Sequence, residues 1–236
     1  MHYSKVTLFI YFSILLAGSY GCSSNEIGES KDVAQDKIYQ YYSVSYHEGN
    51  ENVTLYAQFR FAGINGTTLV LNKPSQVSFD NEVIKADSGD ASGAYYQLYK
   101  QASGFYGNHH FVFTDINNKK FDNDFSFDPF KLVNIPATVS KSQSFDLSFE
   151  TSALKADDHI EVSASDTDSS FSVTYTGEKG GNFITIPENE LKRQKEKQLI
   201  LDITLYRKIP LQQNTAEGGS LEIRYSLKPV KIRLDE

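Results

Sequence analysis

Apolar and polar side chains alternate along much of the chain, which is the pattern of β-strands with one buried face. The alternation is clearest from Val53 to Phe61, where every second side chain is apolar. Residues 38–46 alternate in the same way from Tyr42 onward, with Gln40 as the polar exception on the apolar face. These two runs predict neighbouring strands whose apolar sides line one core.

Turn signals connect further runs into hairpins. Gly63-Ile64-Asn65-Gly66 follows the clearest run, and Asn-Gly accepts the positive φ angles of tight turns. Asp80-Asn81 and the segment 115–120 interrupt later runs with residues that favour turns. The strands expected in this half of the chain are 38–46, 53–61, 67–71, 76–85 with its turn, 94–101, 109–115 and 121–127.

The second half of the chain has shorter runs separated by Asp, Ser and Gly clusters, a spacing typical of a sandwich. Pro187 precedes acidic and then basic residues up to Gln194, which predicts one short helix. The strands expected here are 145–149, 160–164, 171–175, 183–186, 199–206, 221–227 and an edge strand at 230–234.

Prolines mark a break between the two halves, since Pro129 and Pro136 can donate no hydrogen bond to a strand ladder. The predicted fold class is all-β, with two antiparallel β-sandwich domains. We place an N-terminal β-sandwich at 38–132 and an Ig-like β-sandwich at 133–236.

The N-terminal segment has the features of an export signal. Lys5 precedes an apolar run from Val6 to Ala17, which is too short to span a bilayer but long enough for a signal-peptide core. Cys22 is the one cysteine of the chain and follows small residues, which resembles a bacterial lipoprotein signal. That resemblance implies cleavage after residue 21 and a lipid on Cys22. The alternative is an ordinary secretory signal cut near Gly18 or Gly21.

Residues 22–37 are polar and acidic and show no periodicity, so we expect a flexible tether that carries the lipidated Cys22. Four motifs extend the resemblance: the Arg60–Leu69 hairpin, Phe113-Thr-Asp115, Ile186-Pro187 and Gly218–Tyr225. Together they resemble uncharacterised bacterial lipoproteins with two tandem β-sandwich domains behind a lipidated cysteine. The resemblance implies anchorage in the cell envelope, at the outer membrane and facing the periplasm or the surface. It carries over no functional residues.

Composition narrows the possible partners. The chain has a net charge of −7, which disfavours nucleic acid and anionic lipid surfaces as partners. A single cysteine excludes an intramolecular disulfide, so packing and sheet hydrogen bonds must stabilise the fold. The membrane contact that we expect is the lipid anchor alone.

Residue types that carry chemistry are scattered. His109 and His110 are adjacent in an expected strand, so their side chains should point to opposite faces and not chelate one ion. Weak calcium binding at Asp122-Asn-Asp124 or Asp166-Thr-Asp168 is an alternative to simple turns. The chain has no Gly-x-Ser-x-Gly or Ser-x-x-Lys motif, and we expect no catalytic residue, metal or cofactor.

A glycine-flanked aromatic loop is the strongest binding candidate. Tyr99 precedes Gly104-Phe105-Tyr106-Gly107, and exposed aromatic side chains on a loop can contact a protein or a glycan. The alternative is that Phe105 or Tyr106 folds back over the open end of the sandwich. The sequence therefore predicts an envelope lipoprotein that acts in binding or structure. A non-catalytic accessory module for carbohydrate or surface polymer is the first alternative, and a hydrolase the second.

Overall fold

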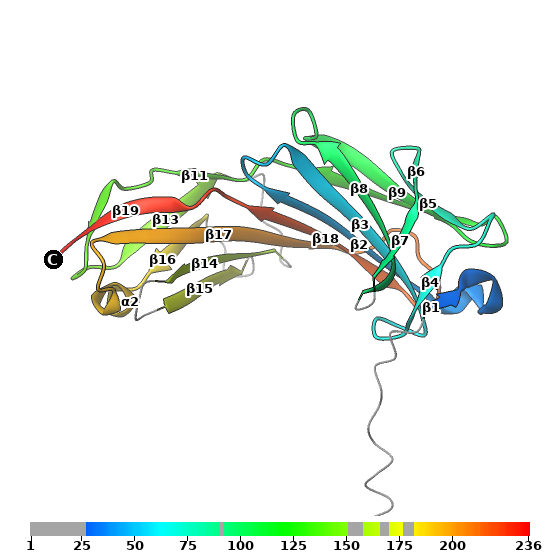
Figure 1. Ribbon diagram of the computed structural model, residues 1–236. Helices are drawn as coiled ribbons and strands as arrows, with labels where there is room; N and C mark the ends of the chain where they lie inside the picture. Colours follow the sequence, from blue (N-terminus) through cyan, green and yellow to red (C-terminus); the bar gives the residue numbers. More distant parts are fainter. Residues whose placement is uncertain (1–26, 90–91, 151–157, 166–169, 177–181) are drawn as a thin grey trace, which may run out of the picture.

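The computed structural model describes residues 27–89, 92–150, 158–165, 170–176 and 182–236. β-strands are the main secondary structure of the described chain, which forms an elongated molecule with its C-terminus at one tip (Figure 1). The all-β class and the sandwich architecture are confirmed. Cys22 lies outside the described residues, as does the acidic cluster at 166–168.

One long sheet runs the length of the molecule. Its central strand order is β1-β4-β3-β2-β18-β17-β14-β15, with β7 and β8 added beside β3 and with β12 and β19 added beside β17. The bounds are β1 Ile27–Glu29, β2 Ile38–His47, β3 Asn52–Phe61, β4 Thr67–Val70, β7 Ala86–Gly89, β8 Gly93–Gln101, β12 Thr138–Ser140, β14 His159–Ser165, β15 Ser170–Thr176, β17 Gln198–Ile209, β18 Gly219–Ser226 and β19 Val230–Asp235.

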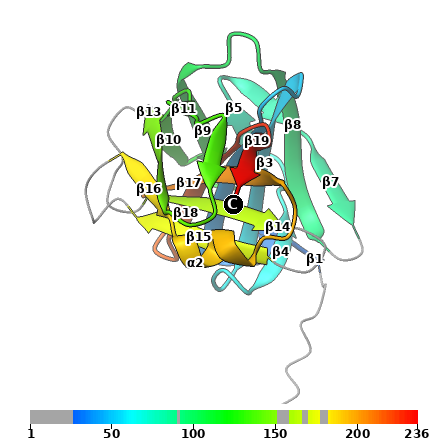
Figure 2. The same ribbon diagram turned by 90° about the vertical axis from the view of Figure 1, so that its left-hand side faces the viewer.

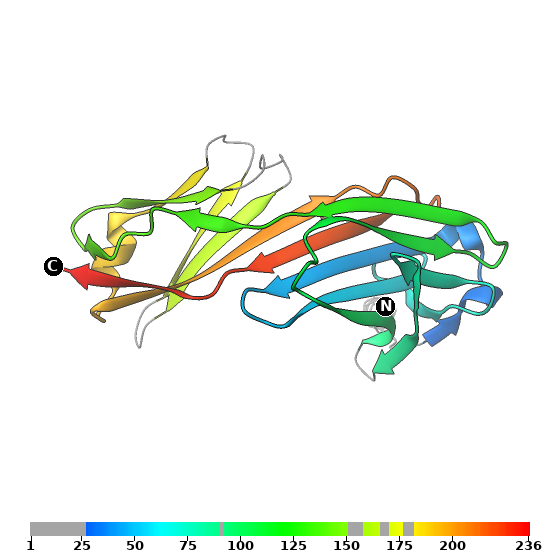
Figure 3. The same ribbon diagram turned by 90° about the horizontal axis from the view of Figure 1, so that it is seen from above.

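Two smaller sheets cover the inner side of this long sheet at either end (Figures 2 and 3). The first has the order β10-β9-β5-β6 and the second the order β11-β13-β16. Their bounds are β5 Gln76–Phe79, β6 Glu82–Ile84, β9 Gly107–Thr114, β10 Lys120–Phe127, β11 Lys131–Val133, β13 Phe145–Glu150 and β16 Phe183–Ile186. The helix α2, Glu188–Arg193, follows β16, as the sequence predicts.

Aromatic side chains fill the core between the long sheet and the first small sheet. Tyr42 of β2 stacks on Phe111 of β9 at 4.8 Å, and Phe59 of β3 lies 4.6 Å from Phe113 of β9, measured between ring centroids. All four side chains are fully buried. Each pair therefore fixes one sheet against the other.

The three hairpin turns expected in the first half are confirmed. β3 and β4 pair across Gly63–Gly66, although the positive φ angles there are at Ala62 and Gly63 and not at Asn65-Gly66. β5 and β6 pair across Asp80-Asn81, where both residues have positive φ angles. β9 and β10 pair across the turn that begins at Asp115. The turn residues thus specify the local antiparallel pairings.

β18 joins parts of the chain that are far apart in sequence. It pairs antiparallel with β17 and, over its full length, parallel with β2. Strand pairing thus connects residues on both sides of the boundary expected at 132, and that boundary stays a prediction. Parallel pairing also occurs between β1 and β4 and between β12 and β19.

Two expectations are wrong. Residues 27–37 are not a flexible tether, because β1 pairs with β4 and two short 3-10 helices, η1 Ser30–Asp32 and η2 Gln35–Lys37, follow it. Ser30 is buried, and its hydroxyl accepts the backbone N–H of Asn72 at 2.9 Å. β19 is not an edge strand, because it lies between β12 and β17.

Candidate functional site

The outer face of the long sheet carries tyrosines where a sandwich surface is usually covered by small polar or charged side chains. The pairing of β8, β3 and β2 places Tyr95, Tyr56 and Tyr41 on this face. The Tyr56 and Tyr95 rings stack at a centroid distance of 5.6 Å, and Tyr41 meets Tyr56 edge-on at 6.1 Å. We call these three residues the tyrosine row.

A groove of about 460 Å³ continues from the tyrosine row across β18, β17 and β14. We call it the outer groove. Its walls are mainly side chains of the outer face, and they come from strands on both sides of the expected domain boundary. The lining residues are Tyr41, Ser43, Ser45, His159, Tyr206, Arg207, Lys208, Glu222, Ile223 and Arg224.

Stacked side chains form one end of the outer groove. The pairing of β14, β17 and β18 puts His159, Tyr206 and Arg224 side by side. The His159 and Tyr206 rings are 4.6 Å apart and nearly parallel, and the Arg224 guanidinium lies 5.5 Å from the Tyr206 ring centroid. Such stacking limits the motion of the three side chains, so this end of the groove is preorganised.

A hydrogen-bonded pair forms the other end. The Tyr41 hydroxyl donates to Oε2 of Glu222 at 3.2 Å. Burial, followed by the charge of Glu222, raises the pKa of Tyr41 to about 12. The hydroxyl therefore remains protonated at neutral pH, and Glu222 keeps acceptor capacity for a ligand.

The structure separates the aromatic residues that the sequence singled out. Tyr99 lies on the same outer face, is 60% exposed, and its hydroxyl accepts the side-chain amide of Gln97 at 2.6 Å. Phe105 is only 5% exposed and stacks 4.2 Å from the His109 ring. The alternative of a folded-back loop is therefore correct for Phe105, which cannot serve as a surface contact.

Tyr106 lies away from the outer face. It is 46% exposed, yet its hydroxyl pairs with that of the buried Tyr225 at 2.9 Å and its ring stacks on Phe127. The three residues expected to bind a ligand therefore lie in different environments. Tyr99 is on the exposed outer face, Phe105 is in the core, and Tyr106 packs against Phe127 and Tyr225. A ligand contact by Tyr99 or Tyr106 stays a prediction.

The adjacent residues His109 and His110 both contact the side chain of Asp80. His109 Nδ1 lies 2.7 Å from one carboxylate oxygen of Asp80, and His110 Nδ1 lies 3.4 Å from the other. Asp80 lies in the turn between β5 and β6, where its φ angle is positive. Its carboxylate therefore contacts the imidazole rings of both histidines. Across the described residues, no three His, Cys, Asp or Glu side chains are grouped as a metal site would require.

The Asp122–Asp124 segment, which the sequence offered as a weak calcium site, is hydrogen-bonded to the loop before β18. The Asp122 and Asp124 backbone N–H groups donate to the side chains of Gln213 and Gln212, at 3.1 and 2.6 Å. Asn123, buried between them, donates to the Gln213 carbonyl at 2.9 Å. The loop before β18 thus covers the open edge of β10.

Sequence reasoning missed the outer groove. In the run 38–46, Tyr39 and Tyr41 alternate with the side chains of the apolar face, but this pattern does not group them with Tyr56, Tyr95 and Tyr206. Tyrosines at alternate positions of several strands were the available signal. Their grouping depends on strand order, which local patterns do not contain.

No protein-family model matches the chain, and no curated protein matches it significantly. Among solved structures, DIP-gamma IG1+IG2 is 11% identical with a TM-score of 0.22, over 84% of this chain and 95% of that chain. A tetra-tandem repeat from the extending region of a large adhesion protein is 15% identical with a TM-score of 0.25, over 83% and 49%. The Bacteroides ovatus mixed-linkage glucan protein SGBP-B is 10% identical with a TM-score of 0.19, over 86% and 65%. Likenesses this distant do not indicate a function.

Proposed function

We propose that the protein is a non-catalytic binding module of the bacterial envelope that holds a glycan across the tyrosine row and the outer groove. The observation that carries this proposal is the composition of the groove. Ring faces at Tyr206 and Tyr41 alternate with hydroxyl, carboxylate and cationic groups. A sugar ring presents both apolar C–H faces and many hydroxyls, and it therefore matches such a mixed surface.

The charge of the outer groove fits a neutral ligand. Lys208 and Arg224 face Glu222 in the lining, while the buried Arg207 is neutralised by Asp158, whose oxygens lie 3.0 to 3.1 Å from it. No strong field of one sign results. A neutral polysaccharide therefore fits better than nucleic acid or a highly charged protein segment.

The arrangement favours binding over hydrolysis. Glu222 is the one carboxylate of the groove lining, and the tyrosine hydroxyl at 3.2 Å occupies one of its oxygens. Hydrolysis of a glycoside requires two carboxyl groups on either side of the bond. His159 stacks on Tyr206, and no hydrogen bond to a described serine or carboxylate activates it.

A lipid on Cys22 would hold the folded part of the protein close to the membrane. The first described strand begins at Ile27, so only residues 23–26 separate the cysteine from the fold. Throughout the described segments, no helix has the length and apolar character needed to cross a bilayer. We propose the lipid as the anchor, at the outer membrane and facing the periplasm or the surface.

Two measurements test these proposals. A glycan array probed with residues 23–236, which contain the whole described fold, should reveal binding to neutral oligosaccharides. An array without any reproducible neutral glycan would overturn the glycan proposal. Mass spectrometry of the mature N-terminus should find two or three acyl chains on Cys22, and an unacylated terminus would overturn the anchor.

A further inference from the structure

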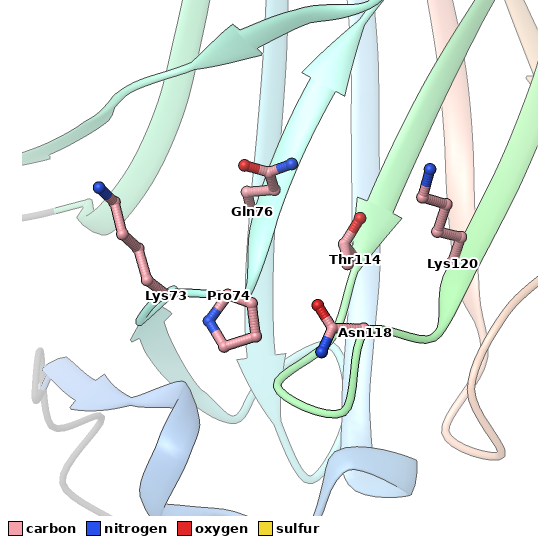
Figure 4. Close-up of a pocket in the computed structure, with 6 residues that line it drawn as sticks. All are labelled: Lys73, Pro74, Gln76, Thr114, Asn118 and Lys120. Atoms are coloured by element: carbon pink, nitrogen blue, oxygen red, sulfur yellow. The ribbon is translucent and has the colours of Figure 1, made fainter.

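A second pocket lies on the outer face of the small sheet β10-β9-β5-β6, away from the outer groove. It has a volume of about 550 Å³, and its lining residues are Lys73, Pro74, Gln76, Thr114, Asn118 and Lys120. Figure 4 shows Lys73 and Lys120 at opposite sides of this pocket, with Gln76 and Thr114 between them. We call it the lysine pocket.

Strand register sets the donors of the lysine pocket side by side. Thr114 of β9 pairs with Gln76 of β5 on one side and with Lys120 of β10 on the other. An amide, a hydroxyl and an ammonium group therefore form one row on neighbouring strands, about 5 Å apart. Each can donate a hydrogen bond toward the same volume.

Two ordered turns form the remaining walls. In the turn between β9 and β10, the buried Asp115 accepts the backbone N–H groups of Asn117 and Lys119 at 2.8 and 2.9 Å, and Asn118 has a φ angle of 63°. On the other side, the Ser75 N–H donates to the Asn72 carbonyl at 2.7 Å. Asn118 and Lys73 are thus held on short, hydrogen-bonded turns.

The charge of the lysine pocket is opposite to that of the molecule. The chain has a net charge of −7, yet the lining contains two lysines and no carboxylate. The ion pairs of the described residues include neither Lys73 nor Lys120. Both ammonium groups are therefore available to an anionic ligand.

We propose that the lysine pocket binds an acidic sugar through a carboxylate or sulfate group placed between Lys73 and Lys120. Gln76, Thr114 and Asn118 then bind hydroxyls next to the charged group. The occupant is a soluble acidic sugar, because its neutral hydroxyls match the amide and hydroxyl side chains that line the pocket between the two lysines.

Amide chemical shifts measured by NMR test this proposal, with glucuronate, glucose 6-sulfate and neutral glucose as probes. We expect glucuronate or glucose 6-sulfate to shift the amides of Gln76, Thr114, Asn118 and Lys120, and glucose to leave them unchanged. The variant Lys73→Ala/Lys120→Ala should weaken the binding at least about fivefold, because it removes both charge-assisted contacts. The matched variant Lys85→Ala/Lys231→Ala removes the same charge from exposed positions elsewhere and should change it less than twofold.

Three results would overturn the proposal. They are no change in the amide shifts with either anion, equal changes with glucose and with the anions, or an equal loss of affinity in the two double variants. The test is independent of the outer groove. Substitution of Tyr56 and Tyr206 should leave the shifts at the lysine pocket unchanged, so failure of one site is distinguishable from failure of the other.

Discussion

Arg207 is a charged residue on the core-facing side of β17, where the preceding side chains Ile203 and Leu205 are apolar and buried. The Arg207 guanidinium donates to both carboxylate oxygens of the fully buried Asp158 and lies 3.5 Å from Asp128. Asp128 directly follows β10 and Asp158 directly precedes β14. The cluster therefore joins three parts of the chain through one buried cation.

The substitution Arg207→Met should lower the free energy of unfolding by about 3 kcal/mol, because it leaves the carboxylate of Asp158 buried without its cation. Urea unfolding followed by circular dichroism measures the change. The matched variant Arg233→Met breaks an exposed pair with Asp235 and should lower it by no more than about 0.5 kcal/mol. Equal losses in the two variants would contradict a stabilising role for the buried cluster.

The pKa of Tyr41 provides a test of the hydrogen bond between Tyr41 and Glu222 in the outer groove. Its folded pKa of about 12 lies above the value of about 10 for an unfolded tyrosine, so the neutral hydroxyl stabilises the fold. This contribution is complete below about pH 10 and is lost as the pH rises through about 12. Replacement of Glu222 by Gln removes a nearby negative charge and should lower the pKa of Tyr41, as ultraviolet titration of the phenol can show. An unchanged pKa of Tyr41 in the Glu222→Gln variant would contradict the contact between Tyr41 and Glu222.

At the scale of elements, the hairpins were predictable from the sequence, and the pairing of strands distant in sequence was not. Asp80 and Asn81 both have positive φ angles, which Asp and Asn tolerate, so the sequence alone was sufficient for this turn. The turn between β3 and β4 was also placed correctly, but its positive φ angles are at Ala62 and Gly63 and not at Asn65-Gly66. The parallel pairing of β2 with β18 depends on residues about 180 positions apart, and no local signal encodes it. The outer groove requires that pairing, which explains why its residues were not grouped from the sequence.

The loop between β8 and β9 behaves as part of the core, and Phe105 tests this. Its ring stacks on Phe79 and His109, so Phe105→Ala should lower the free energy of unfolding by about 3 kcal/mol. Tyr99→Ala on the exposed face should change it by about 0.5 kcal/mol or less. Thermal unfolding of both variants distinguishes the two positions, and similar small losses would mean that the loop is not packed as described.

At the scale of the whole molecule, the long sheet makes the two ends of the protein interdependent. β18 contributes the buried Leu221, Ile223 and Tyr225 and separates β2 from β17. Without β18, the edge of β2 and the apolar side chains beneath it would be exposed to water.

We therefore expect residues 23–236 to unfold in one cooperative transition, and the fragment 27–132 not to fold alone. Urea titration with circular dichroism and tyrosine fluorescence measures both. Two separate transitions, or a cooperatively folded fragment, would instead support the domain boundary expected at residue 132.

Glycan binding on the outer face is tested most directly by affinity electrophoresis through gels that contain the best-binding neutral glycan of the array. The variant Tyr56→Ala/Tyr206→Ala should bind at least about tenfold more weakly than the unmodified protein, because it removes ring faces from both the tyrosine row and the outer groove. Phe183→Ala, which removes an exposed aromatic ring from β16 of the second small sheet, should bind within about twofold of it. Full binding by the double variant, with its fold intact by circular dichroism, would contradict the account.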